Sequence, residues 1–168
     1  TDELQSEVTM SVLYFDVLKH NSKKPLWKLR DYLFLSNGHV CPVLYASLSK
    51  AGYFPKEQLF SLRKINSSLQ GHPHENSIAG LENTSGPLGQ GLSQAVDLAV
   101  SLKRDGKKNK VYCIVGDGEI EEGQCWEAFM FAGREKLSNL TVIVDRNYIQ
   151  IDGDTESVLH LEPLNKKL

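Results

Sequence analysis

Two oxygen-bearing side chains stand where the sequence could hold a metal ion. Asp117 lies between Gly116 and Gly118 directly after an apolar run, and Asn147 follows a second apolar run. A carboxylate, an amide oxygen and a backbone carbonyl supply half of an octahedral oxygen shell, which phosphates and water complete around magnesium. The flanking glycines let a ligand approach the backbone closely. This pattern therefore predicts a site for a metal and a diphosphate.

The segments around these residues predict a βαβ unit. Residues 111–115 and 140–144 are unbroken apolar runs, typical of strands in a parallel sheet that is covered on both faces. Residues 122–136 between them have helical periodicity. The residues predicted to face inward from this helix are Trp126, Phe129, Met130 and Gly133. Because crossover-linked parallel strands end at one edge of the sheet, Asp117 and Asn147 should face one crevice, where the helix offers N–H groups to a phosphate.

The rest of the chain predicts more helices and one more strand around the same sheet. The stretch 66–87 has no periodicity, and an irregular stretch of this length is usually functional or disordered. Residues 1–168 are therefore predicted to form a single α/β domain with a central, mostly parallel sheet and helices on both faces. The further predicted elements are helices over 3–19, 39–51, 55–63 and 88–103 and a buried strand over 32–35.

Composition excludes several classes of function. Of the 168 residues, 40% are hydrophobic and 24% charged, and the formal net charge of −2 provides no basic field for nucleic acid or a membrane surface. No apolar run is long enough to span a bilayer. Cys41, Cys113 and Cys125 fit neither a zinc site nor a disulfide framework. We therefore expect Cys113 and Cys125 to be buried thiols, and the protein to be cytoplasmic.

Each candidate residue also has an ordinary structural explanation. The segment Gly116-Asp117-Gly118 could be a simple turn, and Asn147 a loop residue favoured by its turn propensity. His72 could be a solvated loop residue, and Glu122 could only favour the first turn of a helix. Residue types and spacing alone leave both interpretations open.

Five segments together resemble the transketolase family of thiamine-diphosphate enzymes. Residues 116–118 (GDG) with Asn147 resemble the metal and diphosphate motif of the wider superfamily. The other four segments are similar to transketolases in particular and follow the family's order over nearly the whole chain. They are residues 35–39 (LSNGH), 70–73 (QGHP), 85–91 (SGPLGQG) and 145–153 (DRNYIQIDG).

The resemblance implies a role for each residue of the site. Asp117, Asn147 and the backbone carbonyl of Ile149 should hold the metal, Mg²⁺ or Ca²⁺. His39 and His72 should be catalytic, His39 near the phosphates and His72 at the hydroxyls of the sugar. The residues implied to bind thiamine diphosphate are His39, Gly86, Leu88, Gly116, Asp117, Gly118, Asn147 and Ile151.

The resemblance also implies an activity and a partner. Transketolases move a two-carbon ketol unit between sugar phosphates, as in the pentose phosphate pathway, and the cofactor carries out the covalent chemistry. In the family, a glutamate on a separate pyrimidine-binding domain activates the cofactor, and no segment here matches it. We therefore expect half of an active site, completed by a partner chain in a homodimer or heterotetramer. Glu122 matches a family glutamate that communicates across the subunit interface.

The family's cofactor domain is longer than this chain at both ends. It has a Gly-His-Pro-Gly segment before the first helix and continues past the position of Leu168. The chain is therefore expected to be a split subunit, a reduced form or a fragment, with exposed apolar sheet edges. Two hypotheses stay open: an enzyme component that works with a partner, or a non-catalytic homologue that acts as a binding or interaction protein.

Overall fold

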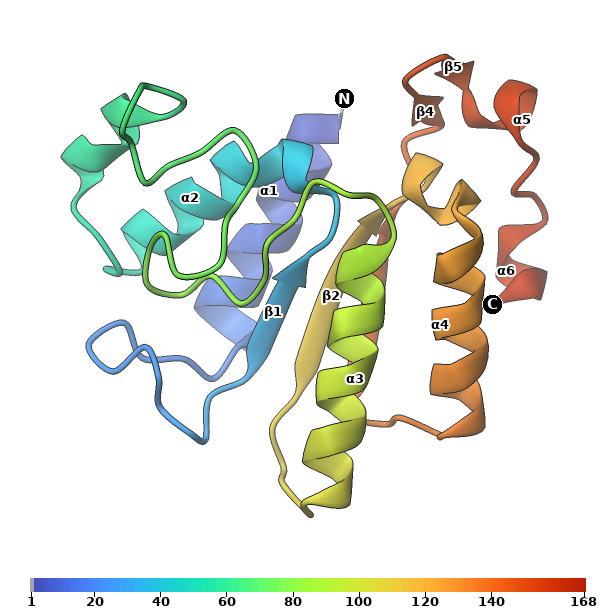
Figure 1. Ribbon diagram of the computed structural model, residues 1–168, viewed down its shortest axis with the longest axis horizontal. Helices are drawn as coiled ribbons and strands as arrows, with labels where there is room; N and C mark the ends of the chain where they lie inside the picture. Colours follow the sequence, from blue (N-terminus) through green and yellow to red (C-terminus); the bar gives the residue numbers. More distant parts are fainter. Residues whose placement is uncertain (1) are drawn as a thin grey trace.

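The predicted α/β class is confirmed by the structure, a computed structural model that describes residues 2–168, with side chains from Ser6 onward. Thr1, which the predicted domain includes, lies outside the described residues. Three strands form a parallel sheet in the order β1-β2-β3, between helices on both faces (Figure 1). The strands are β1 (Tyr32–Leu35), β2 (Val111–Gly116) and β3 (Leu140–Asp145), each within one residue of its predicted bounds.

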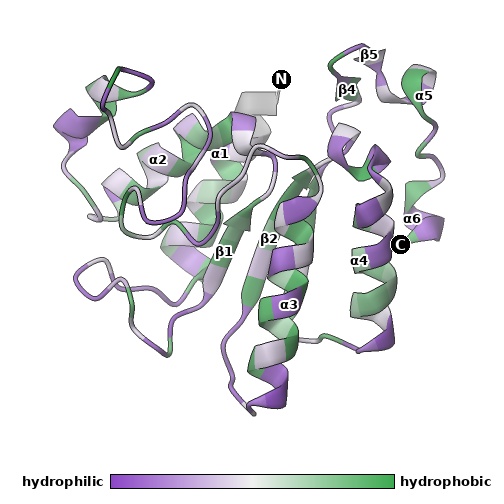
Figure 2. Ribbon diagram, viewed as in Figure 1, coloured by the Kyte–Doolittle hydropathy of each residue, from purple (hydrophilic) through white to green (hydrophobic). Residues whose placement is uncertain are grey.

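Alternate side chains of β2 pack into two separate hydrophobic cores, one on each face of the sheet. Val111, Cys113 and Val115 are buried among residues of α3 (Gln90–Arg104) and α4 (Gly123–Arg134). Ile114 is buried on the opposite face, among residues of α1 (Asp2–Val12) and α2 (Cys41–Lys50). This alternation follows from the period of two in a strand. Figure 2 shows hydrophobic residues along the sheet and on parts of α3 and α4.

Several predicted helices differ from the observed ones at their ends. Residues 3–19 form α1 and then a π-helical turn, and residues 66–87 contain no helix or strand, as predicted. Residues 55–63 form only a 3₁₀ turn, and a second such turn precedes α2. The bounds of these turns are η1 (Leu13–Val17), η2 (Gly38–Val40) and η3 (Lys56–Ser61).

The predicted inward face of α4 is partly wrong. Met130 has an exposed fraction of 72%, and Gly133 is exposed as well. The residues fully enclosed are Cys125 and Ala128, whereas Trp126 and Phe129 are partly buried against the same core. The 3₁₀ turn η4 (Gly118–Glu121) precedes α4, which starts within one residue of its predicted start. The core-facing stripe is centred on Cys125 and Ala128, each one residue before the predicted Trp126 and Phe129.

The strand β3 is less covered than its apolar sequence suggests. Thr141 is exposed, and Val142, Ile143 and Val144 are only partly buried. As β3 is an edge of the three-stranded sheet in the described part of the chain, it has one strand neighbour instead of two. The apolar side chains at this edge are therefore partly buried and not exposed as expected. The three cysteines are free and buried, which confirms the prediction made for Cys113 and Cys125.

A small C-terminal unit follows β3 and lies beside the end of the sheet (Figure 1). It begins with an antiparallel hairpin that pairs Ile149 with Asp154. The elements of the unit are β4 (Ile149–Gln150), β5 (Gly153–Asp154), α5 (Thr155–Val158) and α6 (Leu164–Lys167).

Between residues 2 and 168, no helix combines the length and the apolar character needed to cross a membrane.

Candidate functional site

A cavity of about 650 Å³ lies at the carboxyl end of β2. Every residue that the sequence placed in the site lines this cavity, although these residues come from five separate segments of the chain. Their roles toward a cofactor or metal stay predictions. The lining consists of Gly38, His39, His72, Gly86, Leu88, Gly116, Asp117, Gly118, Glu119, Glu121, Glu122, Asn147, Ile149, Gln150 and Ile151.

Adjacent parallel strands bring the two predicted metal-binding side chains to one edge. Gly116 at the end of β2 pairs with Asp145 at the end of β3. The N–H of Asp117 donates to the carbonyl of Asp145 over 3.1 Å, so the two strands separate only beyond this point. Asn147 follows two residues later. The two strands are therefore neighbours in the sheet, and both side chains border the same cavity.

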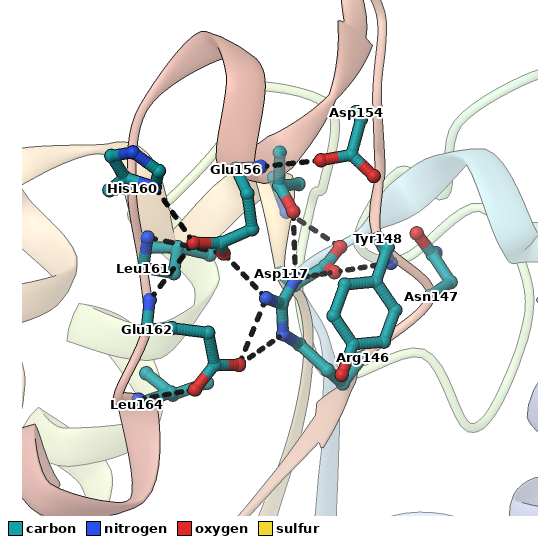
Figure 3. Close-up of polar contacts among 12 residues, drawn as sticks. Asp117, Arg146, Asn147, Tyr148, Asp154, Glu156, His160, Leu161, Glu162 and Leu164 are labelled. Atoms are coloured by element: carbon teal, nitrogen blue, oxygen red, sulfur yellow. Dashed lines mark hydrogen bonds and ion pairs between the residues drawn. The ribbon is translucent and has the colours of Figure 1, made fainter.

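The carboxylate of Asp117 is fully buried and is held by several donors. Oδ1 accepts the N–H of Gly118 over 2.8 Å. Oδ2 accepts the N–H of Tyr148 and Nη1 of Arg146, each over 2.7 Å (Figure 3). A buried carboxylate is costly without such partners. Because each oxygen can accept more than one hydrogen bond, Oδ1 keeps acceptor capacity for a further ligand.

The loop after β3 folds back on the glycine turn that holds Asp117. Oδ1 of Asn147 accepts the N–H of Ile149 over 2.7 Å, which closes a local turn around Tyr148. A Cβ added to Gly118 would stand 3.3 Å from the carbonyl oxygen of Ile149, so only glycine allows this close approach. The carboxylate, amide and carbonyl oxygens of the predicted metal set thus border one turn.

This donor set has the chemistry of a site for a hard cation. Oxygen ligands of mixed type, with open positions for phosphate and water, are what magnesium takes from proteins. Among the side chains that the structure describes, from Ser6 onward, no three histidine, cysteine, aspartate or glutamate residues gather as a metal site. The residues present therefore fit a metal that shares its shell with a diphosphate, with Asp117 as the one carboxylate ligand.

The glycine-rich loop crosses the end of β1 at Gly38. A Cβ at this position would meet Oγ of Ser85 at 2.7 Å, the backbone nitrogen of Gly86 at 3.1 Å and Cδ2 of His72 at 3.1 Å. Contacts under 3.0 Å are not tolerated without a shift of the neighbour. Three of the segments that resemble the family therefore meet at one glycine, beside the exposed side chain of His39.

Sequence reasoning missed Glu119, which is buried with an exposed fraction of 3%. Its Oε1 accepts the hydroxyl of Ser36 and the N–H of Gly89, the latter over 2.7 Å, and its Oε2 accepts the N–H of Gly116 over 3.2 Å. One carboxylate thus joins the end of β1, the glycine-rich loop and the end of β2. A glutamate after a glycine turn resembles a solvated first-turn residue, so the sequence gives no signal for this role.

Glu121 and Gln150 also line the cavity without having been predicted. Nε2 of Gln150 donates to Oε2 of Glu121 over 3.3 Å, whereas Oε1 of Glu121 has no hydrogen-bond partner among the described residues. Burial, and then the charges of Asp117 and Glu156, raise the pKa of Glu121. Glu121 thus places a second carboxyl group at the cavity, and a bound cation would favour its ionised form.

Three apolar side chains, those of Leu88, Ile149 and Ile151, stand exposed at this cavity. Ile151 has an exposed fraction of 96%, and Leu88 of 36%. Glu122, at the start of α4, is exposed too and makes no side-chain cap of that helix. The approach of a helix N-terminus to the phosphates stays a prediction, since Glu122, the N-cap residue of α4, lines the cavity. Gly118 itself begins the short 3₁₀ turn η4, which precedes α4.

Comparison with known families gives a match over almost the whole chain. Residues 5–166 match the family model described as "Transketolase, thiamine diphosphate binding domain". The chain is 44% identical over 158 residues to the 6-deoxy-6-sulfo-D-fructose transketolase subunit SqwG of Clostridium sp. (strain MSTE9), covering 94% of this chain and 58% of that protein. It is 41% identical over 166 residues to an apulose-4-phosphate transketolase subunit of Actinobacillus succinogenes, covering 99% and 60%.

Solved structures agree with these sequence matches. Transketolase from Leishmania mexicana superposes with a TM-score of 0.87 at 37% identity, covering 99% of this chain and 28% of that chain. Transketolase from Campylobacter jejuni gives 0.85 at 36% identity, covering 94% and 26%. The chain thus spans about three fifths of the curated subunits and about a quarter of the transketolases of known structure.

Proposed function

The chain belongs to the transketolase family, within its thiamine-diphosphate-binding domain, and from this premise we propose that its cavity binds thiamine diphosphate through a divalent metal ion. The observation that supports this most directly is the convergence of five sequence segments on one cavity. Asp117, Asn147 and the carbonyl of Ile149 would hold Mg²⁺ or Ca²⁺. These oxygens border the turn that also contains Gly118.

The remaining cavity residues would position the cofactor and the sugar. The N–H of Gly118 and the imidazole of His39 would contact the diphosphate, and Gly86 and Leu88 the aminopyrimidine. The exposed side chain of Ile151 would gain an apolar contact at the thiazolium. When bound, thiamine diphosphate supplies the carbon centre that stores the transferred unit as a stabilised carbanion. His72, next to Gly38, would orient hydroxyl groups of the substrate.

The activity that follows is ketol transfer between sugar phosphates, carried out together with a second chain. Two relatives bear names that describe them as transketolase subunits, one for a sulfo-sugar and one for a sugar phosphate. By analogy, we propose that this chain contributes the diphosphate half of the site. A pyrimidine-binding chain would complete it, in a homodimer or heterotetramer, with Glu122 at the interface. The exposed position of Glu122 supports an interface role.

Reconstitution of the two-chain enzyme tests this function. The protein is assayed for ketol transfer with thiamine diphosphate and Mg²⁺, alone and together with a pyrimidine-binding transketolase chain. We expect turnover only in the mixture, and its loss in the Glu122→Ala variant of this chain. Glu127→Ala is the control, because Glu127 is exposed on α4 outside the cavity.

The alternative hypothesis makes a different prediction in the same assay. A non-catalytic homologue would bind its partner and give no turnover with any sugar phosphate tested. Turnover by this chain in the absence of any partner would contradict the proposed division of the site.

A further inference from the structure

The guanidinium of Arg146 occupies the centre of a polar network at the edge of the candidate site. Nη1 donates to Oδ2 of Asp117 and to Oγ1 of Thr155, each over 2.7 Å. Nη2 donates to Oε1 of Glu156 over 2.6 Å and to Oε1 of Glu162 over 3.0 Å. Figure 3 shows the three carboxylates around the one cation. Arg146 therefore links the buried carboxylate of the candidate site to the C-terminal unit.

The burial of this network makes its hydrogen bonds significant. The exposed fraction of the side chain is 16% for Arg146 and 1% for Asp117. The guanidinium carbon also lies 3.8 Å from the ring centroid of Tyr148, which covers one side of the cation. Removal of one member of such a pair leaves an uncompensated buried charge. The network is therefore sensitive to each of its members.

The same carboxylates hold the C-terminal unit to itself. Glu156 accepts the N–H of Leu161 and of Glu162, each over 3.3 Å, and contacts the imidazole of His160 over 3.0 Å. Glu162 accepts the N–H of Leu164 over 3.0 Å. The path from Asp117 to α6 thus consists of one arginine and two glutamates. No residue of this path beyond Asp117 lines the cavity.

We propose that Arg146 is a positioning residue, which fixes the carboxylate of Asp117 for the metal and couples the order of residues 155–164 to cofactor binding. This rests on the proposed function in one respect, the assignment of Asp117 as the metal ligand. Arg146 and the N–H of Tyr148 engage Oδ2, whereas Oδ1 accepts one N–H only. The arrangement thus leaves Oδ1 as the oxygen with acceptor capacity for the metal.

The planar fork of arginine is needed for this role. Its donors reach Asp117 and Glu156 through different nitrogens. A lysine is a single point charge on a flexible stem and does not reproduce a fixed fork. Partners of metal ligands typically contribute 10- to 100-fold to metal affinity. We therefore expect Arg146→Lys to be impaired, but less than Arg146→Met.

The first test measures cofactor binding by calorimetry, with thiamine diphosphate and Mg²⁺ titrated into the whole protein. We expect the dissociation constant to rise roughly 10- to 100-fold in Arg146→Met and by a smaller factor in Arg146→Lys. Arg134→Met is the matched control, because Arg134 is exposed at the end of α4 and should bind as the parent does. Tighter binding by Arg146→Met would show competition with the metal and would overturn the proposal.

The second test measures hydrogen exchange without cofactor, and so separates the proposed coupling through Arg146 from the assignment of Asp117 as the metal ligand. Hydrogen exchange of residues 155–164 is measured in the parent protein, Asp117→Asn and Glu156→Gln. We expect faster exchange in both variants, although Asp117 lies far from this segment in sequence. Glu156→Gln, which leaves the cavity lining intact, should also weaken cofactor binding.

The outcomes of the two tests distinguish the coupling from the assignment of the site. Unchanged hydrogen exchange of residues 155–164 in Asp117→Asn would refute the coupling between Asp117 and this segment, regardless of the result of the cofactor-binding experiment. Absence of cofactor binding by the parent protein would refute the proposed function, while faster exchange in the variant would still support the network. If Arg146→Met fails to fold, Glu156→Gln alone decides, and unaltered binding by it would refute the proposal.

Discussion

At the scale of single residues, Glu119 connects the segments that form the cavity. Its carboxylate accepts donors from Ser36, Gly89 and Gly116, which belong to three separate segments. Within hydrogen-bonding distance of this carboxylate the structure gives backbone and hydroxyl donors and no cationic side chain among the described residues. Hydrogen bonds to a charged group stabilise more than neutral ones do. Glu119 is therefore a structural support of the site.

Replacement of Glu119 by glutamine tests this support. The amide nitrogen of glutamine would face a donor that the carboxylate now accepts, so we predict a free energy of unfolding lower by about 1–3 kcal/mol. Denaturant unfolding of Glu119→Gln measures this, with Glu127→Gln as the control on the exposed face of α4. Equal stability of the two variants would contradict the role given to Glu119.

Gly38 provides a second test at this scale. A methyl group there would overlap Oγ of Ser85, so Gly38→Ala should destabilise the fold by about 1–3 kcal/mol. Gly133→Ala is the matched control, because nothing lies within 4 Å of a Cβ at Gly133 and alanine favours a helix. The double variant Gly38→Ala/Ser85→Ala should recover part of the loss. A neutral effect of Gly38→Ala on thermal unfolding would argue against the tight crossing.

At the scale of elements, the β strands were predictable and the faces of the helices were less so. Apolar runs at 32–35, 111–115 and 140–144 identify the three strands within one residue, because buried parallel strands carry unbroken apolar sequence. The inward face of α4 was mispredicted at Met130, because apolar residues occupy more than one side of this helix, with Met130 and Phe131 both exposed, so apolar character alone does not identify the buried face. Local sequence pattern therefore predicts whether a segment is a helix or a strand better than it predicts which face of a helix is buried.

The C-terminal unit gives a prediction of pH dependence. The hydrogen bonds that Glu156 makes lower the pKa of its carboxyl group from 4.5 to about 2. The bond with His160 contributes most, followed by those with the N–H of Glu162 and with Arg146. Since the folded-state pKa is the lower one, the stabilisation is complete above about pH 4.5 and is lost as the pH falls toward 2.

Unfolding free energies measured between pH 5 and pH 2 test this point. The parent protein should lose stability with falling pH more steeply than Glu156→Gln, which has no carboxyl group to protonate at this position. Carboxylates that do not interact with Glu156 titrate alike in both proteins, so the difference between the two curves reports Glu156 together with its neighbours Glu121 and Glu162. Parallel curves for the two proteins would show that Glu156 is not held as the structure indicates.

At the scale of the whole molecule, the site was predictable as a set but not in its internal contacts. Resemblance to a family assigns His72, Gly86 and Asn147 to one site, and the structure places them around one cavity. Glu119 and Arg146 were missed because each acts through partners distant in sequence. Residue pattern reveals ligands of a site more readily than the charges that support those ligands.

The central claim is that this cavity binds thiamine diphosphate through a metal at Asp117, and calorimetry tests it most directly. Thiamine diphosphate is titrated into the protein with Mg²⁺, with a chelator, and into Asp117→Ala with Mg²⁺. Asp97→Ala, altered at an exposed position of α3, is the control. We predict saturable binding to the parent protein and to Asp97→Ala, and none with the chelator or in Asp117→Ala. Equal binding in Asp117→Ala would contradict the account.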